Sequence, residues 1–235
     1  MRPMVGLLGL LCSVIANAQV IDTSVPLPIA PDAARDIHDA GERYALVGAW
    51  DADPWAMSFM LRYETYAGFR GPAIAEHQHA LLSLLRRFGD TRFADALRGE
   101  APLVHLNVLT ALRRAAGSDS SRLAARYPLT FGPRVPGEPS VEECAMRERA
   151  HQPTPARLLP GAAPIGPLPS APKPLAMMVQ VDAAGVPELY TMGLPAHSDS
   201  ATWAAVKAAV SRWRFAPAQI DGCGIPYLYQ AVLQP

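Results

Sequence analysis

Few residues of this chain have the type and spacing that chemistry requires. Of its six histidines, only His77 and His79 lie close together in sequence, and on a helix two such residues point in different directions. His105 lies beside a stripe of leucines, which favours a partly buried helix residue over a general base. The motifs HExxH, CxxC, GxSxG and the glycine-rich phosphate loop do not occur. We therefore expect no catalytic residue, no metal, no cofactor and no enzymatic activity.

Charge argues against a nucleic-acid partner. The 21 basic and 21 acidic side chains cancel, and no run of basic residues is longer than a pair. Phosphate binding needs a local surplus of lysine and arginine, which this sequence does not have.

Residues 1–18 follow the pattern of a secretory signal peptide. Arg2 precedes an apolar run, and Ala16-Asn17-Ala18 supplies small residues for a cleavage site after Ala18. The run is shorter than the roughly 20 apolar residues that a membrane-spanning helix needs. Gly9-Leu10-Leu11 before Cys12 lacks the small residue that lipid attachment favours next to the cysteine. We therefore expect a secreted chain that begins at Gln19.

The mature chain then keeps two cysteines, Cys144 and Cys223. In an oxidising compartment such a pair often forms a disulfide, which here would join the middle of the chain to its C-terminal part. The sequence leaves two free thiols as an equal alternative.

Composition divides the mature chain into three parts. Residues 19–131 show helical spacing of apolar residues, interrupted at Asp53-Pro54, Gly71-Pro72, Gly89-Asp90 and Gly117, and predict an all-α domain of four or five helices. Residues 132–174 are rich in proline and predict an extended linker, in which Ser140 begins a short helix over 141–150. Residues 175–235 form the third part.

The helical part also contains a cluster of aromatic residues. Two interpretations stay open for it, namely packing in the core of the domain or a groove that binds a peptide or a glycan. The cluster comprises Trp50, Trp55, Phe59, Tyr63, Tyr66 and Phe69.

Residues 175–235 predict a β-β-α-β module. Alternating apolar residues over 177–192 predict a hairpin around Asp182 to Gly185. A helix should follow from Asp199 or Ser200, with Trp203 and Trp213 on one buried face, and end before Pro217. Asp221-Gly222 should turn the chain into a third strand over 227–233. The expected fold class is α+β, with a three-stranded antiparallel sheet covered by one helix.

This part resembles the C-terminal domain of TonB, the energy transducer that links the inner membrane to outer-membrane receptors in Gram-negative bacteria. The resemblance rests on residues 178–182 followed by Gly185, and on the string Trp213-Arg214-Phe215-Ala216-Pro217-Ala218 followed by Asp221-Gly222. Trp203 and the residues of this string, namely Trp213, Arg214, Phe215, Pro217, Asp221 and Gly222, are expected to make the fold.

The resemblance implies that the module grips an extended protein segment by backbone hydrogen bonds at the edge of its sheet. Here the edge would be formed by Tyr227, Leu228, Tyr229, Gln230, Ala231 and Val232. The partner would be a protein of the cell envelope, such as a segment of an outer-membrane receptor, and the location would be the periplasm. Alternatively, the same edge joins two copies of the chain into a homodimer, in a structural role that leaves binding to the helical domain.

The chain departs from a TonB transducer in its first half. Its N-terminal apolar run is of the cleavable kind and contains no histidine, and a helical domain takes the place of the start of the long periplasmic span. We therefore expect a periplasmic relative that uses the binding module, and a link to energy-coupled transport follows only from the resemblance.

Overall fold

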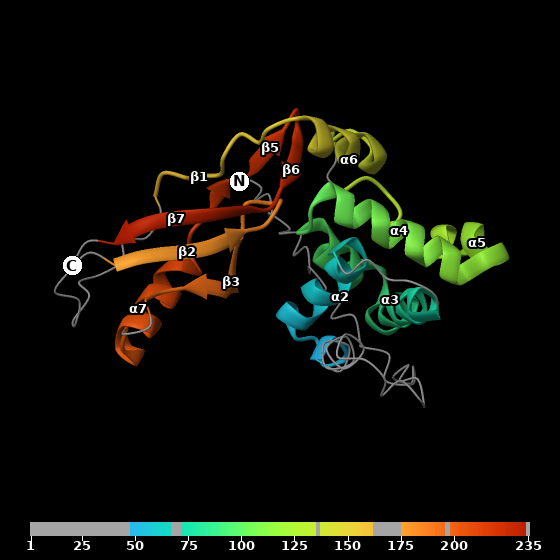
Figure 1. Cartoon of the computed structure of the whole chain (residues 1–235), viewed down its shortest axis with the longest axis horizontal. Coiled ribbons are helices and arrows are strands. Elements are labelled where there is room, and N and C mark those ends of the chain that lie inside the picture. Colours follow the sequence, from blue (N-terminus) through green and yellow to red (C-terminus); the bar gives the residue numbers. More distant parts are fainter. Residues whose placement is uncertain (1–47, 67–71, 135–136, 162–174, 196–197, 234–235) are drawn as a thin grey trace, which may run out of the picture.

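The computed structural model describes residues 48–66, 72–134, 137–161, 175–195 and 198–233. Figure 1 shows a helical half and a half built around a β-sheet, with helix α6 lying where they meet. Residues 1–47, which include the predicted signal peptide, lie outside the described residues. Among the described residues, no helix is both long and apolar enough to cross a membrane.

The helical half is built on three long helices. They are α2 (Pro54–Tyr66), α3 (Pro72–Arg98) and α4 (Pro102–Ala116), followed by the short turn η1 (Gly117–Asp119) and α5 (Ser120–Arg126). Each long helix begins with proline, whose fixed φ suits the first turn and whose missing N–H costs nothing there. The expected stop at Gly89 is a kink inside α3, because this residue takes a φ of 70°. Most leucines of the helical pattern lie in the core of this half, whereas Leu103 and Leu106 of the stripe beside His105 are only partly buried.

Helix α6 (Val141–Ala150) has the bounds expected from its sequence. The Ser140 side chain accepts a hydrogen bond from the N–H of Glu143, as the capping pattern requires. The helix packs against α4, and its Cys144 forms a disulfide with Cys223 in the sheet half. The bond closes a loop of 79 residues, which removes chain entropy worth roughly 4.5 kcal/mol from the unfolded state in the polymer model.

The fold class expected for the C-terminal part is confirmed as α+β with a three-stranded antiparallel sheet. Strands β2 (Leu175–Val181), β3 (Pro187–Gly193) and β7 (Tyr227–Leu233) lie in the order β3-β2-β7. Strand β7 pairs with β2 without interruption from Leu175↔Leu233 to Val181↔Tyr227, whereas the β2–β3 pairing contains an irregularity between Met178 and Gln180.

The turn between β2 and β3 is held by the carboxylate of Asp182. Its Oδ1 accepts hydrogen bonds from the backbone N–H groups of Ala184 (2.9 Å) and Val186 (2.7 Å). Gly185 has a φ of 85°, which favours glycine. A Cβ placed on it would lie 2.2 Å from the carbonyl oxygen of Phe215, whose own N–H donates to the Gly185 carbonyl. The turn is thus fastened to the string that follows the helix.

Helix α7 (Ser200–Val210) begins at Asp199, whose carboxylate accepts from the N–H of Thr202. The predicted placement of Trp213 on this helix was wrong, because α7 ends at Val210. The turn that follows brings Trp213 into the core, where it is only 5% exposed. Trp203 is only partly buried and packs at the margin of this core. Pro217 therefore does not stop the helix.

The turn Asp221-Gly222 closes a separate hairpin of β5 (Ala218–Ile220) and β6 (Cys223–Ile225). Both turn residues have positive φ, at 47° and 85°, as a two-residue hairpin turn of type I′ requires. The chain then enters β7 through Pro226, so the turn does not lead directly into the third strand as predicted.

The prediction that residues 151–174 form an extended tether was wrong for their first part in one respect, because this part is extended but pairs with the C-terminal half. Strand β1 (Arg157–Leu158) pairs with β4 (Phe215–Ala216), and Thr154 exchanges two backbone hydrogen bonds with Gln219. Prolines 153 and 155 leave the N–H of Thr154 free to donate, so alternate proline does not prevent pairing. Residues 162–174 of the predicted linker lie outside the described residues.

Gly185 and Gly222 both lie in turns with positive φ, and together they allow a matched test of the contact between Gly185 and the Phe215 backbone. Replacement of Gly222 by alanine brings no atom within 4 Å and costs only the strain of positive φ, about 1–2 kcal/mol. Gly185→Ala adds a collision with the Phe215 backbone, and we expect it to lower the free energy of unfolding by at least about 3 kcal/mol. Denaturant unfolding of both variants with the disulfide intact measures this difference. Equal losses would contradict the role assigned to Gly185.

Candidate functional site

The strand expected to bind a partner, β7, lies at an edge of the three-stranded sheet. In the described part of the chain it pairs with β2 alone. In an antiparallel ladder, about half of an edge strand's residues direct their N–H and C=O groups away from the neighbouring strand. β7 therefore presents a row of backbone donors and acceptors over seven residues.

The side chains of β7 alternate between a packed and an exposed face. Tyr227, Tyr229 and Ala231 pack at the margin of the core of this half, and Leu228, Gln230 and Val232 are exposed. Tyr229 packs against Phe215 with ring centroids 4.8 Å apart. The Trp213–Phe215 string therefore positions β7 by packing against its inner face.

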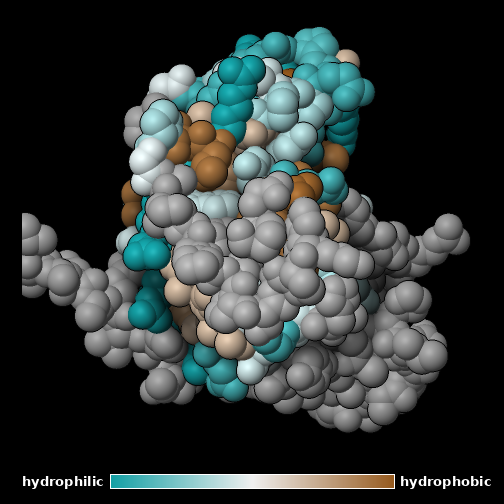
Figure 2. Space-filling model, turned by 90° about the vertical axis from the view of Figure 1, so that its left-hand side faces the viewer, coloured by the Kyte–Doolittle hydropathy of each residue, from teal (hydrophilic) through white to brown (hydrophobic). Residues whose placement is uncertain are grey.

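The outer face of this sheet carries exposed apolar side chains. Met178 on β2 is 46% exposed, and Leu228 and Val232 on β7 are 49% and 63% exposed. A shallow depression of about 220 Å³ runs along these two strands, from Ala176 and Met178 to Gln230 and Val232. Figure 2, which views the molecule from the sheet end, shows brown hydrophobic surface among hydrophilic residues. The face next to the open edge is therefore suited to apolar side chains.

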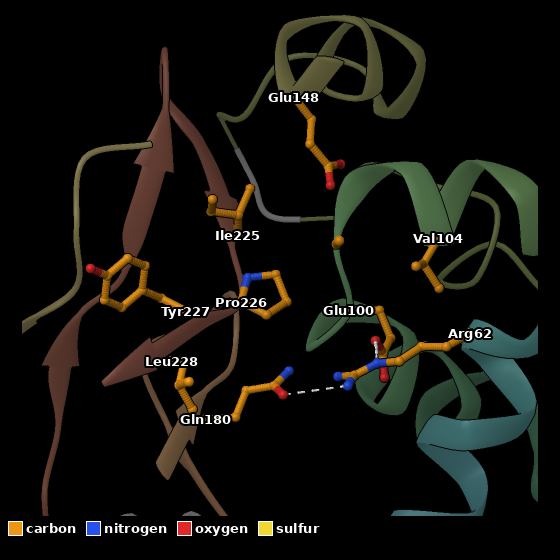
Figure 3. Close-up of a pocket in the computed structure, with 10 residues that line it drawn as sticks. Arg62, Glu100, Val104, Glu148, Gln180, Ile225, Pro226, Tyr227 and Leu228 are labelled. Carbon is orange, nitrogen blue, oxygen red and sulfur yellow. Dashed lines mark hydrogen bonds and ion pairs between the residues drawn. The ribbon is translucent and has the colours of Figure 1, made fainter. Parts of the chain in front are cut away.

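At the other end of β7, its first residues line a pocket between the two halves. The pocket has a volume of about 430 Å³ and is bounded by α2, the start of α4, helix α6 and the strands β2 and β7. Figure 3 shows Arg62 and Glu100 on the helical side and Gln180 and Leu228 on the sheet side. Glu148 enters from α6, where its carboxylate accepts from the N–H of Leu103 at the start of α4 (2.8 Å).

An ion pair occupies the base of this pocket. Nε of Arg62 donates to Oε2 of Glu100 at 2.5 Å, and the Ser58 hydroxyl donates to Oε1 at 2.7 Å. Arg134 donates to the backbone carbonyl of Glu100 at 2.9 Å. Glu100 is only 2% exposed, and burial raises the pKa of its carboxyl against the opposing effect of the Arg62 guanidinium. The carboxylate is thus satisfied by hydrogen bonds, which a buried charge requires.

Arg62 also reaches across to the sheet half. The Gln180 amide is best hydrogen-bonded when its oxygen faces Arg62. In this orientation the oxygen accepts from both terminal nitrogens of Arg62, at 2.8 and 3.2 Å. The carboxylate of Glu188 on β3 lies 3.7 Å from Arg62. One backbone hydrogen bond, from the Ala183 N–H to the Gly99 carbonyl (3.2 Å), crosses beside them. Together with the disulfide, these contacts join the two halves.

Glu188 is the titrating group of this junction. Its side chain is 12% exposed, and burial raises its pKa to about 7, while Arg62 opposes the rise and the charge of Glu100 adds to it. Burial likewise raises the pKa of Asp182 in the neighbouring turn. The junction therefore gains negative charge as pH rises through neutrality.

The sequence contains no motif that marks Arg62, Glu100 or Glu188. The one available signal was that Glu100 lies in the short connection between two apolar helices, next to a glycine. Gln180 lies 118 residues along the chain from its partner Arg62, and Glu188 lies still further away, a proximity that only the fold can show.

The histidines of the described segments do not gather into a site. His105 is buried, and burial lowers its pKa to about 3, which keeps the ring neutral. Within the described ranges, no three histidine, cysteine or acidic side chains come together in a way that could hold a metal ion.

A pH titration of stability tests the position of Glu188. Its folded pKa of about 7 lies above its ordinary value of 4.5, so the folded state holds more protons between these values. The contribution of the protonated carboxyl is complete below about pH 4.5 and is lost as pH rises through 7. Glu188→Gln imitates the protonated form, and we expect it to exceed the native chain in stability by up to about 3 kcal/mol at pH 8 but by little at pH 4.5.

Urea unfolding at both pH values gives this difference, and Glu142→Gln on the exposed side of α6 is the matched control. The control should follow the native chain at both pH values. If Glu188→Gln behaves like the control, Glu188 does not titrate in the junction.

Comparison of the chain with models of protein families, with curated proteins and with solved structures gives no match.

Proposed function

We propose that this chain is a periplasmic TonB-like protein whose C-terminal module binds an extended segment of an envelope protein by strand addition to β7. The single observation that carries the proposal is the edge of β7. The strand keeps full register with β2 over seven residues and pairs with nothing else among the described residues.

Natural proteins usually protect such an edge. They place lysine, proline, a bulge or a covering helix on it, because an open edge invites pairing with any other chain. β7 has none of the protecting residues, since its sequence Tyr-Leu-Tyr-Gln-Ala-Val-Leu contains no charge, proline or glycine. An edge left in this state is suited to pairing with a partner.

The apolar outer face adds selectivity to this pairing. A strand added beside β7 would direct every second side chain to the face that carries Leu228 and Val232. Apolar side chains at these positions would cover the exposed surface next to the edge. The partner segment that fits is therefore extended and apolar at alternate positions.

Two further features agree with a periplasmic setting. The signal-like sequence over 1–18 predicts export, and the disulfide between Cys144 and Cys223 is of the kind that persists in oxidising compartments. A non-enzymatic role is part of the proposal, because binding at a strand edge needs only backbone groups and packing.

Site-specific photocrosslinking tests the edge directly. A photoreactive residue at position 230 or 232 of the full chain, expressed in Gram-negative cells, should capture the same envelope protein. The same residue at Ala208, exposed on α7, should not capture it. With the crosslinker at 230, the added substitution Leu228→Glu should reduce capture about tenfold, which corresponds to roughly 1.4 kcal/mol of lost binding energy.

Two results would count against the proposal. Crosslinks at 230 and 232 that join only two copies of this chain would favour the homodimer, in which β7 pairs with its own copy. Capture that is equal at 208 and 230 would mean that the edge is not the binding surface.

A further inference from the structure

A second cleft lies between the two halves, away from β7. It is formed by helix α2 and strand β3, has a volume of about 240 Å³, and is lined mainly by apolar surface. Trp55, Phe59 and Tyr63 come from α2, and Tyr190 faces them from β3. The sequence left open whether these aromatic residues pack in the core or form a groove.

The three aromatic residues of α2 form a ladder along one face of the helix. They are spaced four residues apart, with ring centroids 5.5 Å apart for Trp55–Phe59 and 5.0 Å for Phe59–Tyr63. Trp55 is 46% exposed and Tyr190 is 36% exposed, whereas Trp50 is buried in the core of the helical half.

Phe59 also packs against the core of the helical half, and Tyr63 lies against the buried His77, with ring centroids 5.8 Å apart. The ladder therefore lies between the core and the cleft, and its exposed end at Trp55 borders the cleft. Phe69 of the predicted cluster lies outside the described residues.

The polar groups beside the ladder already bond to the protein. The Ser58 hydroxyl donates to Glu100, Arg62 pairs with Glu100, and the Thr191 hydroxyl donates to the Glu188 carbonyl and accepts from the Gln180 N–H. The cleft therefore offers few of the free hydrogen-bonding groups that a sugar needs. A ligand that offers apolar rings and few donors fits the cleft better.

Proline-rich segments have this chemistry. Proline lacks an N–H, and in the polyproline II conformation residues three apart lie on one side with a spacing of about 9 Å. From Trp55 to Tyr63 the helix rises by eight residue steps, about 12 Å. Grooves lined by aromatic residues bind such segments at low entropic cost, because the segment is already extended before it binds.

The chain itself contains a segment of this type, which precedes α2 in the sequence. Residues 25–31 read Val-Pro-Leu-Pro-Ile-Ala-Pro, are uncharged, and place Pro28 and Pro31 three residues apart. The described chain begins at Gly48, where an added Cβ would lie 2.8 Å from the Cβ of Ala56, the neighbour of Trp55. The intervening 16 residues, 32–47, reach roughly 22 Å as a flexible chain, which exceeds the length of the ladder.

We propose that the cleft between α2 and β3 binds residues 25–31 of the same chain, with Pro28 and Pro31 against the Trp55–Phe59–Tyr63 ladder and Tyr190. A tether of this length gives the segment an effective concentration in the millimolar range. The cleft is then filled even if the isolated segment binds only with a dissociation constant near 100 μM. This binding is independent of the β7 edge.

The test uses the full mature chain and one peptide. In the variant Pro28→Asp/Pro31→Asp the tethered segment can no longer fill the cleft. A synthetic peptide of residues 24–32 should then bind this variant, and its apparent affinity for the native chain should be at least tenfold weaker. Calorimetry measures the affinity, and the indole N–H signal of Trp55 in NMR, identified by its loss in Trp55→Ala, locates the site.

Two controls separate the site from nonspecific binding. The peptide should not bind when Trp55→Ala is added to the variant, a change that the exposure of Trp55 makes compatible with folding. A peptide with alanine in place of Pro28 and Pro31 should not bind either.

Four outcomes would overturn the proposal. The first is that the peptide of residues 24–32 does not bind the variant, and the second is that it binds the variant and the native chain equally well. The third is that a peptide of residues 163–174 binds the variant in preference. The fourth is that the native chain binds the peptide more tightly when the protein is diluted. The third would assign the cleft to the other proline-rich segment, and the fourth would assign it to a second copy of the chain.

Discussion

The buried carboxylate of Glu100 is the constraint on which the relation between the two halves depends. A charge that is only 2% exposed must be met by donors, and its donors, Ser58 and Arg62, both come from α2. Arg62 in turn directs its remaining nitrogens toward the sheet half, where the Gln180 side-chain oxygen accepts hydrogen bonds and the Glu188 carboxylate lies 3.7 Å away. The requirement to satisfy one carboxylate thus extends through one guanidinium to β2 and β3.

The disulfide supports the same arrangement from the other side. Cys144 lies on α6, which packs on α4, and Cys223 begins β6, which leads through Pro226 into β7. The start of β7 is therefore held by the nearby disulfide and by the contacts that Arg62 makes with the sheet half. In the part of the chain that the structure describes, its far end from Gln230 to Leu233 is held by β2 and by packing on the core. An edge strand fixed in this manner needs little ordering when a partner adds to it, which lowers the entropic cost of binding.

Local sequence patterns predicted the elements well where their cause is local. Ser140 begins α6 and Asp199 begins α7, because capping depends on a side chain and an N–H three residues away. The β2–β3 hairpin followed from alternation and from Gly185. Trp213 was misplaced because its helical spacing to Val210 continues beyond the true end of α7, and the spacing alone cannot show that the chain turns at Ser211.

Features that depend on contacts between distant residues were not accessible in this way. Proline density over 132–174 indicated a free linker, but the pairing of Thr154 with Gln219 and of β1 with β4 depends on a partner some 60 residues away. The junction of Arg62, Glu100 and Glu188 had no motif, because its chemistry arises from burial rather than from spacing. The aromatic residues are an intermediate case, since the sequence predicted that they cluster but not which of them line the cleft.

The two surfaces differ in how their occupancy is controlled. An open strand edge offers backbone groups that every polypeptide can match, so selectivity must come from side chains such as Leu228 and Val232 and from limits on access. The cleft between α2 and β3 offers ring faces to a segment held close by the same chain, so its occupancy depends on tether length rather than on partner concentration. Arg62 borders both the pocket at the start of β7 and the cleft between α2 and β3. Glu188 lies beside Arg62, and burial raises its pKa to about 7. A change of pH near neutrality therefore changes the charge next to Arg62, the residue that the pocket and the cleft have in common.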